Sequence, residues 1–323
     1  MEISFPIKIG LTCNYQTVSN IMKYYGTEIP EEFVYLVMKC NFENDITIHI
    51  PYFSNNAVSK LGYRINVIPF YGQKDFEKKV MELLKKKHPI ILNVKSDLLP
   101  YYPKGNENFQ NEAHALILHG INERMALVSD SYVPYYPPDC IREWIDMDVL
   151  FQAILASKDK DKMMIFEKEE DIAIDLHQIA KDNLKTLLFE SIENNKKMLR
   201  EEEINSQVFE DVKDKSAVFN RMSREEIEDI VKHYRLQWLA FDGPAQIRKF
   251  LENIFTYLQG DNEQYVIYAK AFQEYYRKWI SISNAYFRFS VRYDMEYFDK
   301  VSNRYVTLLN EEINFMKEMV TKI

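Results

Sequence analysis

The chain has 323 residues, 46% of them hydrophobic and 14% aromatic, which is enough for two folded domains with sizeable cores. Its 49 acidic and 41 basic residues give a net charge of −8, and this balance argues against a nucleic-acid-binding surface. No apolar run is long enough to span a bilayer and the first residues show no signal-peptide pattern, so we expect a cytoplasmic protein with no membrane partner. The three cysteines, Cys13, Cys40 and Cys140, include no CxxC pair, which favours a reducing compartment over a disulfide framework.

The first region predicts a mixture of helices and strands. Helical spacing follows Cys13, and a second helix, PEEFVYLVMK, opens with Pro30. Residues 46–70 indicate extended segments, and KDFEKKVMELLKKK indicates a further helix. Three runs have strand character, PIILNV, HALILHGI and MALVSDSY, and the short polar turn between the last two predicts a hairpin. A short helix, DMDVLFQAIL, then precedes KMMIFEK, which we expect at the edge of the sheet.

From about residue 172 onward the pattern is almost entirely helical. Ser223 and Glu226 form a capping box, and Gly243 with Pro244 ends one helix and begins the next. Two long helical patterns follow, and their aromatic residues either form the core of a bundle or line a substrate groove. We therefore predict an α+β domain over 1–170 and an all-helical domain over 171–323. The amphipathic terminal helices are able to pair, which leaves a homodimer open.

Cys13 is the first candidate for chemistry. It opens a predicted helix, where unpaired backbone N–H groups carry partial positive charge and favour a thiolate. A lone cysteine is also a common small buried hydrophobe, so its position alone leaves a structural thiol open.

The hairpin supplies a candidate base and acid. His114 and His119 differ by five positions, which puts them on opposite faces of their strand. Counted from the turn, His114 lies almost opposite Asp130, and a carboxylate there can hold the imidazole in one tautomer. A cysteine early, a histidine later and an acid on the next strand is the order of papain-like folds. We therefore predict a catalytic triad of Cys13, His114 and Asp130, against the alternative of a structural hairpin with a surface aspartate.

A family resemblance rests on four stretches, TCNYQTVSNIMKYYG, PIILNVKSDLLPYY, HALILHGIN and ALVSDSY. They resemble the amino-terminal domain of the butirosin-biosynthesis BtrH acyltransferase family, over roughly residues 5–155. The helical remainder resembles that family's companion domain, above all in WLAFDGPAQIRKFLENIF. The family is related to bacteriocin-processing cysteine peptidases. The resemblance therefore implies a papain-like fold with an antiparallel sheet, and it maps the family triad to Cys13, His114 and Asp130.

The activity that this resemblance implies is acyl transfer in natural-product or antibiotic biosynthesis. An acyl or aminoacyl group would move from the phosphopantetheine arm of an acyl or peptidyl carrier protein, through a Cys13 acyl-enzyme, to an amine-bearing small molecule. The carrier's phosphopantetheine arm would be the acyl donor, and no bound cofactor or metal is expected. A cysteine peptidase and a thioester-releasing hydrolase or cyclase are alternatives with the same triad. A non-catalytic binding module on this fold also stays open.

Three further residues are candidates for substrate binding. Asp97 falls on the family's aspartate before the Leu-Pro stretch and is assigned to the active-site rim, with a helix or loop cap as the alternative. Tyr132 begins the aromatic-proline loop YVPYYPP, which either borders the acyl channel or closes the end of the sheet. Asn14, next to the cysteine, is a candidate donor to the oxyanion.

The oxyanion site departs from the pattern of the processing peptidases. Those peptidases carry a glutamine a few residues before the cysteine, whereas the corresponding stretch here, FPIKIGLT, has none. The backbone N–H of Cys13 is one available donor, and Asn14 and Thr12 are candidates for the second. The missing glutamine weighs more against a peptidase than against a transferase, because a thioester already has a good leaving group.

Overall fold

The computed structural model describes residues 1–41, 54–102, 114–133, 139–169, 173–210, 223–227, 231, 243–292 and 295–323. The chain divides into two compact units, Met1–Ile179 and Ala180–Ile323, where the sequence predicted a division after residue 170. Within the described residues, no helix has the length and apolar character needed to cross a membrane.

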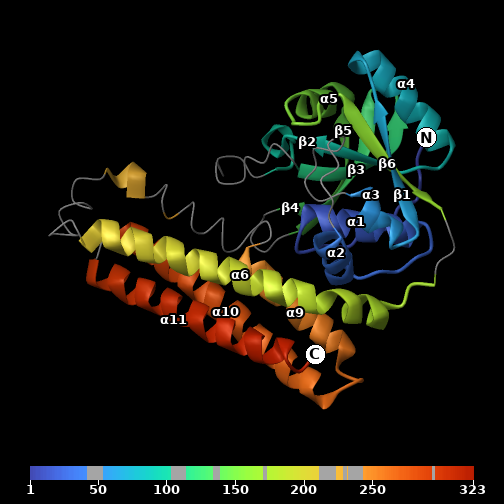
Figure 1. Cartoon of the computed structure of the whole chain (residues 1–323). Helices are drawn as coiled ribbons and strands as arrows, with labels where there is room; N and C mark the ends of the chain where they lie inside the picture. The colour runs from blue at the N-terminus through green and yellow to red at the C-terminus, as the bar shows by residue number, and fades with distance from the viewer. Residues whose placement is uncertain are drawn as a thin grey trace. The chain divides into compact units, whose positions relative to one another are not determined.

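The first unit is built on one six-stranded sheet in which all described pairings are antiparallel (Figure 1). The strands run in the order β1-β6-β2-β3-β4-β5 across the sheet. Their bounds are β1 Tyr63–Pro69, β2 Ile90–Val94, β3 His114–Asn122, β4 Met125–Val133, β5 Asp139–Asp146 and β6 Lys162–Lys168. The predicted α+β class with an antiparallel sheet is confirmed, and so is the hairpin of β3 and β4.

Helices cover both faces of this sheet (Figure 1). Helices α4 (Gly72–Lys85) and α5 (Met147–Leu155) lie on one face, and α1 (Cys13–Tyr24) lies on the other, against β3 and β4. Helix α2 (Glu31–Cys40) packs on α1, and the short α3 (Asn55–Ser59) contacts β1 and α2. Helix α1 is enclosed by these neighbours, so every residue from Cys13 to Met22 is buried.

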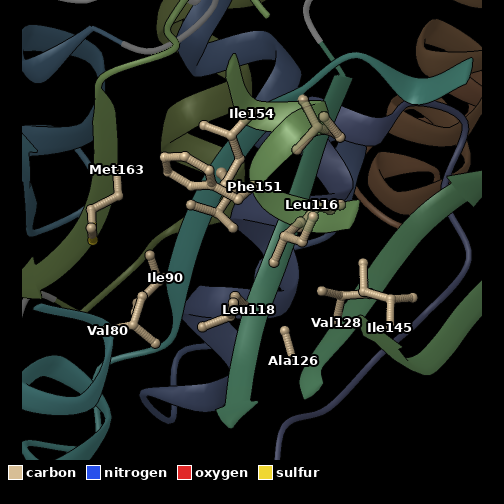
Figure 2. Packing of buried hydrophobic residues seen from close by; sticks show 14 of the residues in the cluster. Val80, Ile90, Leu116, Leu118, Ala126, Val128, Ile145, Phe151, Ile154 and Met163 are labelled. Carbon is tan, nitrogen blue, oxygen red and sulfur yellow. The ribbon is translucent and has the colours of Figure 1, made fainter. Parts of the chain in front are cut away.

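An apolar core fills the space between the sheet and the helices α4 and α5 (Figure 2). Strand alternation puts every second side chain of β3 and β4 on this face, and helical spacing presents the apolar side of α4 and α5 to it. Burying each large aliphatic or aromatic side chain contributes about 1.5–3 kcal/mol. The residues labelled in Figure 2 are Val80, Ile90, Leu116, Leu118, Ala126, Val128, Ile145, Phe151, Ile154 and Met163.

Three sequence-based expectations for this unit are wrong in detail. Residues 55–59, expected to be extended, form α3. Strand β6, expected at the sheet edge, lies between β1 and β2, where its run of buried apolar residues is covered on both sides. Strand β5 was not predicted, because most of its residues are exposed or half-buried at the sheet edge and it lacks clear apolar alternation. Part of the 46–70 segment lies outside the described residues.

The second unit is helical throughout its described part. Its long helices are α6 (Leu176–Glu210, which begins at the end of the first unit), α9 (Pro244–Leu258), α10 (Glu263–Arg292) and α11 (Met295–Val320). The predicted capping box is confirmed, because Ser223 and Glu226 exchange backbone-to-side-chain bonds of 2.6 and 3.2 Å. Gly243 and Pro244 begin α9 as expected, although the residues before them lie outside the described part.

The interior of the second unit combines aromatic packing with one buried polar network. Trp279 is buried, as expected for a bundle core. Its indole Nε1 donates to Glu312, which also accepts two bonds from the Arg248 guanidinium, at 3.0 and 2.5 Å, and one from Asn195. The four side chains come from four different helices, α6, α9, α10 and α11, so the network fixes how these helices align.

Candidate active site

Cys13 is the first residue of α1 and is 2% exposed. The helix begins here because Thr12 adopts an extended conformation and its hydroxyl accepts the backbone N–H of Tyr15 at 3.1 Å. The thiol Sγ lies 3.6 Å from Oδ1 of Asn14, to which it donates. The cysteine thus stands at the amino end of a helix, as predicted, and its sulfur is covered by neighbouring side chains.

His114 and Asp130 form a buried pair within reach of this thiol. Nε2 of His114 lies 2.7 Å from Oδ2 of Asp130, and both side chains are almost fully buried. The His114 side chain is also hydrogen-bonded to the Cys13 side chain. Since Nε2 faces the carboxylate, Nδ1 is the ring nitrogen left to meet the sulfur. The structure therefore brings together the three residues that the sequence predicted as a triad.

The contact between His114 and Asp130 is diagonal across the hairpin. Ile117 pairs with Ser129, so Asp130 lies one residue beyond this pair, while His114 lies three residues before Ile117. The count from the turn, which put His114 almost opposite Asp130, is therefore off by two residues, although the predicted contact is present. A register shift between Leu118 and Gly120, where β3 carries an extra residue, moves the strands relative to a simple count from the turn.

Charge and burial act in opposite directions on the imidazole of His114. Burial on its own lowers the pKa of His114, but the charges of Asp130 and Cys13, and the hydrogen bonds to both, raise that pKa well above its ordinary value. This environment stabilises the protonated imidazole next to the sulfur. When a neutral His114 takes the proton of the nearby thiol, the resulting pair of thiolate and imidazolium is therefore stabilised.

Two consecutive tyrosines that the sequence reasoning did not assign enclose the pair. The phenol of Tyr101 donates to Oδ2 of Asp130 at 3.1 Å, and burial together with the Asp130 charge raises the pKa of Tyr101 well above its ordinary value. The ring of Tyr102 meets the His114 ring edge-on, with centroids 5.5 Å apart, and its hydroxyl is hydrogen-bonded to Ser96. Both tyrosines follow the Leu-Pro stretch that carries the family resemblance, which was the signal available in the sequence.

The three predicted substrate-binding residues differ in their relation to the triad. Asn14 touches the thiol and is buried. Tyr132 is half-buried, and its backbone N–H donates to Oδ1 of Asp130 at 3.1 Å, so it orients the acid through its main chain. Asp97 is exposed in a short 3-10 turn, Ser96–Leu98, with its carboxylate 3.7 Å from Lys95. Its place at the active-site rim stays a prediction.

The hydrogen-bond donors of Thr12 are already bound within the fold. Its backbone N–H and its hydroxyl both donate to Oε1 of Glu31, at 2.8 and 2.7 Å. Since the hydroxyl has a single proton, it cannot also donate to a reacting oxygen. Of the two side chains considered as the second oxyanion donor, Asn14 remains, because its amide protons do not donate to Glu31.

His119 is excluded as the base by its surroundings. It is completely buried, and its ring nitrogens face the Ile3 carbonyl at 3.0 Å and the Ser129 hydroxyl at 2.9 Å. Burial lowers the pKa of His119, so the ring is held neutral in a structural position. Within the described part of the chain, no group of three or more His, Cys, Asp and Glu residues is arranged to hold a metal ion.

A cysteine at the start of a buried helix, with a histidine and an acid on the sheet beside it, is the arrangement of a papain-like cysteine enzyme. Residues 12–131 match the family model described as "Butirosin biosynthesis protein H, N-terminal". The predicted resemblance is thereby confirmed for this part of the chain, which contains all three residues of the triad.

Comparisons with solved structures and with curated proteins give no further information about activity. The chain resembles a solved structure described as "Crystal structure of a double glycine motif protease from AMS/PCAT transporter in complex with the leader peptide", with 16% identity and a TM-score of 0.30. The match covers 52% of this chain and 94% of that one, and a likeness at this level implies no shared activity. A search of curated proteins found no match.

Proposed function

We propose that this protein is an acyltransferase that carries an acyl or aminoacyl group on Cys13. The donor is the phosphopantetheine thioester of an acyl or peptidyl carrier protein, and the acceptor is an amine-bearing small molecule. The observation that supports this most directly is the contact of Cys13, His114 and Asp130 within a segment that matches the BtrH amino-terminal family.

The first half-reaction moves the acyl group onto the enzyme. His114 takes the proton from the Cys13 thiol, and the thiolate attacks the thioester carbonyl carbon. The resulting tetrahedral intermediate collapses with cleavage of the carbon–sulfur bond to the donor. The departing pantetheine sulfur takes the proton from His114, and Asp130 holds the imidazole throughout at Nε2.

The second half-reaction moves the acyl group to the amine. The neutral amine attacks the carbonyl of the acyl-enzyme, and His114 accepts one of its protons. Cys13 leaves as a thiolate and is reprotonated by His114. In total, a thioester and an amine become an amide and a free pantetheine thiol, with no other reactant. The net charge of −8 suits a cationic acceptor such as an aminosugar or a polyamine.

The developing oxyanion needs two donors in both half-reactions. The backbone N–H of Cys13 supplies one, because it lies at the amino end of α1. The side-chain amide of Asn14 supplies the second, since the Thr12 hydroxyl donates to Glu31. Asn14 is 6% exposed and adjoins the nucleophile, so its amide can donate where little water competes.

Incubation of the protein with acyl-loaded carrier protein tests the proposal. We expect an acyl mass adduct on the Cys13 peptide that persists without amine and is released as an amide when amine is added. Cys13→Ala should abolish both events, and Cys140→Ala should change neither. Rapid release of free acid without amine would instead indicate a thioester hydrolase, and cleavage of a peptide substrate would indicate a peptidase. Full transfer activity in Cys13→Ala would contradict the mechanism.

A further inference from the structure

A buried carboxylate outside the triad holds the turn that precedes the nucleophile. Glu31 is the first residue of α2 and is 6% exposed. Its Oε2 accepts the backbone N–H of Leu11 at 2.7 Å, and its Oε1 accepts both the backbone N–H and the hydroxyl of Thr12, at 2.8 and 2.7 Å. One side chain thus binds three donors from the two residues immediately before Cys13.

The Thr12 hydroxyl connects this carboxylate to the helix that carries Cys13. The hydroxyl donates to Glu31 and accepts the N–H of Tyr15, so Glu31 sets the orientation in which Thr12 caps α1. On its other side, the turn is bonded to β4, because the Gly10 N–H donates to the Ser131 carbonyl at 3.1 Å. Ser131 directly follows Asp130 in the sequence. The turn is therefore fixed between α2 and the strand that carries the acid of the triad.

The packing around Gly10 leaves no room for a side chain in the turn. A Cβ atom at this position would lie 2.3 Å from Cβ of Gln16 and 2.9 Å from Oε2 of Glu31. Only glycine allows the main chain to approach α1 and the Glu31 carboxylate this closely.

We propose that Glu31 is a positioning residue for the nucleophile, because its ionised carboxylate fixes the turn at Leu11 and Thr12 that presents Cys13 to His114. This inference rests on the proposed function, in which Cys13 is the attacking group. Among the described residues, no hydrogen bond joins Glu31 to His114 or Asp130. Glu31 therefore acts on the triad through the turn.

The geometry of the turn favours the ionised form of Glu31. Oε1 accepts two donors and Oε2 a third, and a carboxylate binds such donors more strongly than a neutral carboxyl group does. No Lys, Arg or His in the described part of the chain pairs with Glu31, and the charged neighbour that acts on it is Glu32. Burial raises the pKa of Glu31 to about 7, although the three hydrogen bonds lower it, and the charge of Glu32 raises it further.

Stability and positioning consequently respond to pH in opposite directions. Because the folded-state pKa of Glu31 is raised, its contribution to stability is present at low pH and is lost as the pH rises through about 7. Positioning of Cys13 instead improves over the same interval, because Glu31 becomes ionised. A carboxylate with a purely structural role would not produce this opposition.

The test compares Glu31→Gln with Glu32→Gln, which makes the same change one residue away. The rate at which iodoacetamide alkylates Cys13 in the full-length protein is measured by peptide mass spectrometry between about pH 5.5 and about pH 8.5. In the unsubstituted protein we expect an inflection near the pKa of Glu31. Glu31→Gln should lose this inflection and react roughly 10- to 100-fold more slowly at the upper pH, as for loss of hydrogen bonds to a charged group. Glu32→Gln should keep it, displaced slightly to lower pH.

A second readout covers the case in which Glu31→Gln folds poorly. Thr12→Val removes one of the three donors together with the cap on Tyr15, and Thr12→Ser retains both, so only the valine variant should slow alkylation. The thermal midpoint of the unsubstituted protein should also fall more steeply between about pH 5 and about pH 8 than that of Glu31→Gln. An unchanged pH profile in Glu31→Gln, or an equal loss in Glu32→Gln, would overturn the inference. Alkylation needs no acyl donor. If alkylation depended on Glu31 in a protein without transferase activity, only the proposed function would be contradicted, and the positioning role of Glu31 would stand.

Discussion

Tyr101 donates its phenolic proton to Oδ2 of Asp130, the same carboxylate oxygen that faces Nε2 of His114. The acid of the triad is therefore oriented from two sides, and its second oxygen is bound by the backbone N–H of Tyr132. These three contacts fix the orientation of the carboxylate, so that Oδ2 stays directed at the imidazole.

Tyr101→Phe should reduce the rate of acyl-enzyme formation about tenfold, since a hydrogen bond to a charged group contributes about 1.5–3 kcal/mol and each tenfold in rate corresponds to about 1.4 kcal/mol. The matched control is Tyr102→Phe, which keeps its ring against His114 and loses only the bond to Ser96. Single-turnover mass spectrometry of the Cys13 adduct measures both. An equal loss in the two variants would mean that Tyr101 does not act through Asp130.

Asp130→Asn should lower the pKa of His114, because burial would then act without the carboxylate that opposes it. Nuclear magnetic resonance titration of the imidazole measures this shift, and Asp161→Asn, which removes an exposed carboxylate, serves as the control.

The same substitution should change the pH dependence of stability. The raised pKa of His114 contributes stability that is fully present below about pH 6.5 and is lost as the pH rises through the raised value. Urea unfolding of Asp130→Asn at a series of pH values should lack this loss. A His114 titration that is identical in the two proteins would contradict the assigned role of the pair.

Asn14→Ala should lower the acylation rate of Cys13 by roughly 10²- to 10³-fold, the usual effect of losing one oxyanion donor. Alkylation of Cys13 by iodoacetamide should stay close to that of the unsubstituted protein, because that reaction forms no oxyanion. If both rates fall equally, Asn14 acts by holding the thiol through Oδ1 instead of binding the oxyanion.

Arg248→Met should destabilise the helical unit by about 3–5 kcal/mol, because Glu312 would remain buried without its cation. Lys300→Met, which breaks an exposed pair with Glu296, should change stability by about 1 kcal/mol or less. Urea unfolding followed by circular dichroism compares the two. Similar losses would show that the Arg248 network does not determine the packing of this unit.

The sequence predicted which helix and strands carry the site residues better than it predicted the register of the two hairpin strands. Cys13 at a helix start, His114 on one strand and Asp130 on the next follow from local patterns of apolar and polar residues. The diagonal contact depends on the irregularity between Leu118 and Gly120. A glycine within a strand is compatible with a bulge, but it does not by itself determine the register of the strand.

Residues that act on the site from a distance in the sequence were not predictable in the same way. Glu31 lies 20 residues after Leu11, and its position at the start of α2 reads as an ordinary helix-terminal acid. Tyr101 reaches Asp130 across 29 residues. Both contacts arise only when the sheet and the helices have packed, so they belong to tertiary structure. The one signal in the sequence was the family resemblance around the Leu-Pro stretch that precedes Tyr101.

The place of β6 has a consequence for how the protein is made. Strands β1 and β2 are each bonded to β6 in the sheet, and β6 ends at Lys168, well beyond the last residue of the triad. A growing polypeptide that has left the ribosome only as far as Asp130 already holds all three reactive side chains, yet β1 still has no partner strand. We therefore expect the thiol of the nascent chain to lack its enhanced reactivity until residue 168 emerges, and a fragment that stops at residue 131, where the family match ends, to remain unfolded.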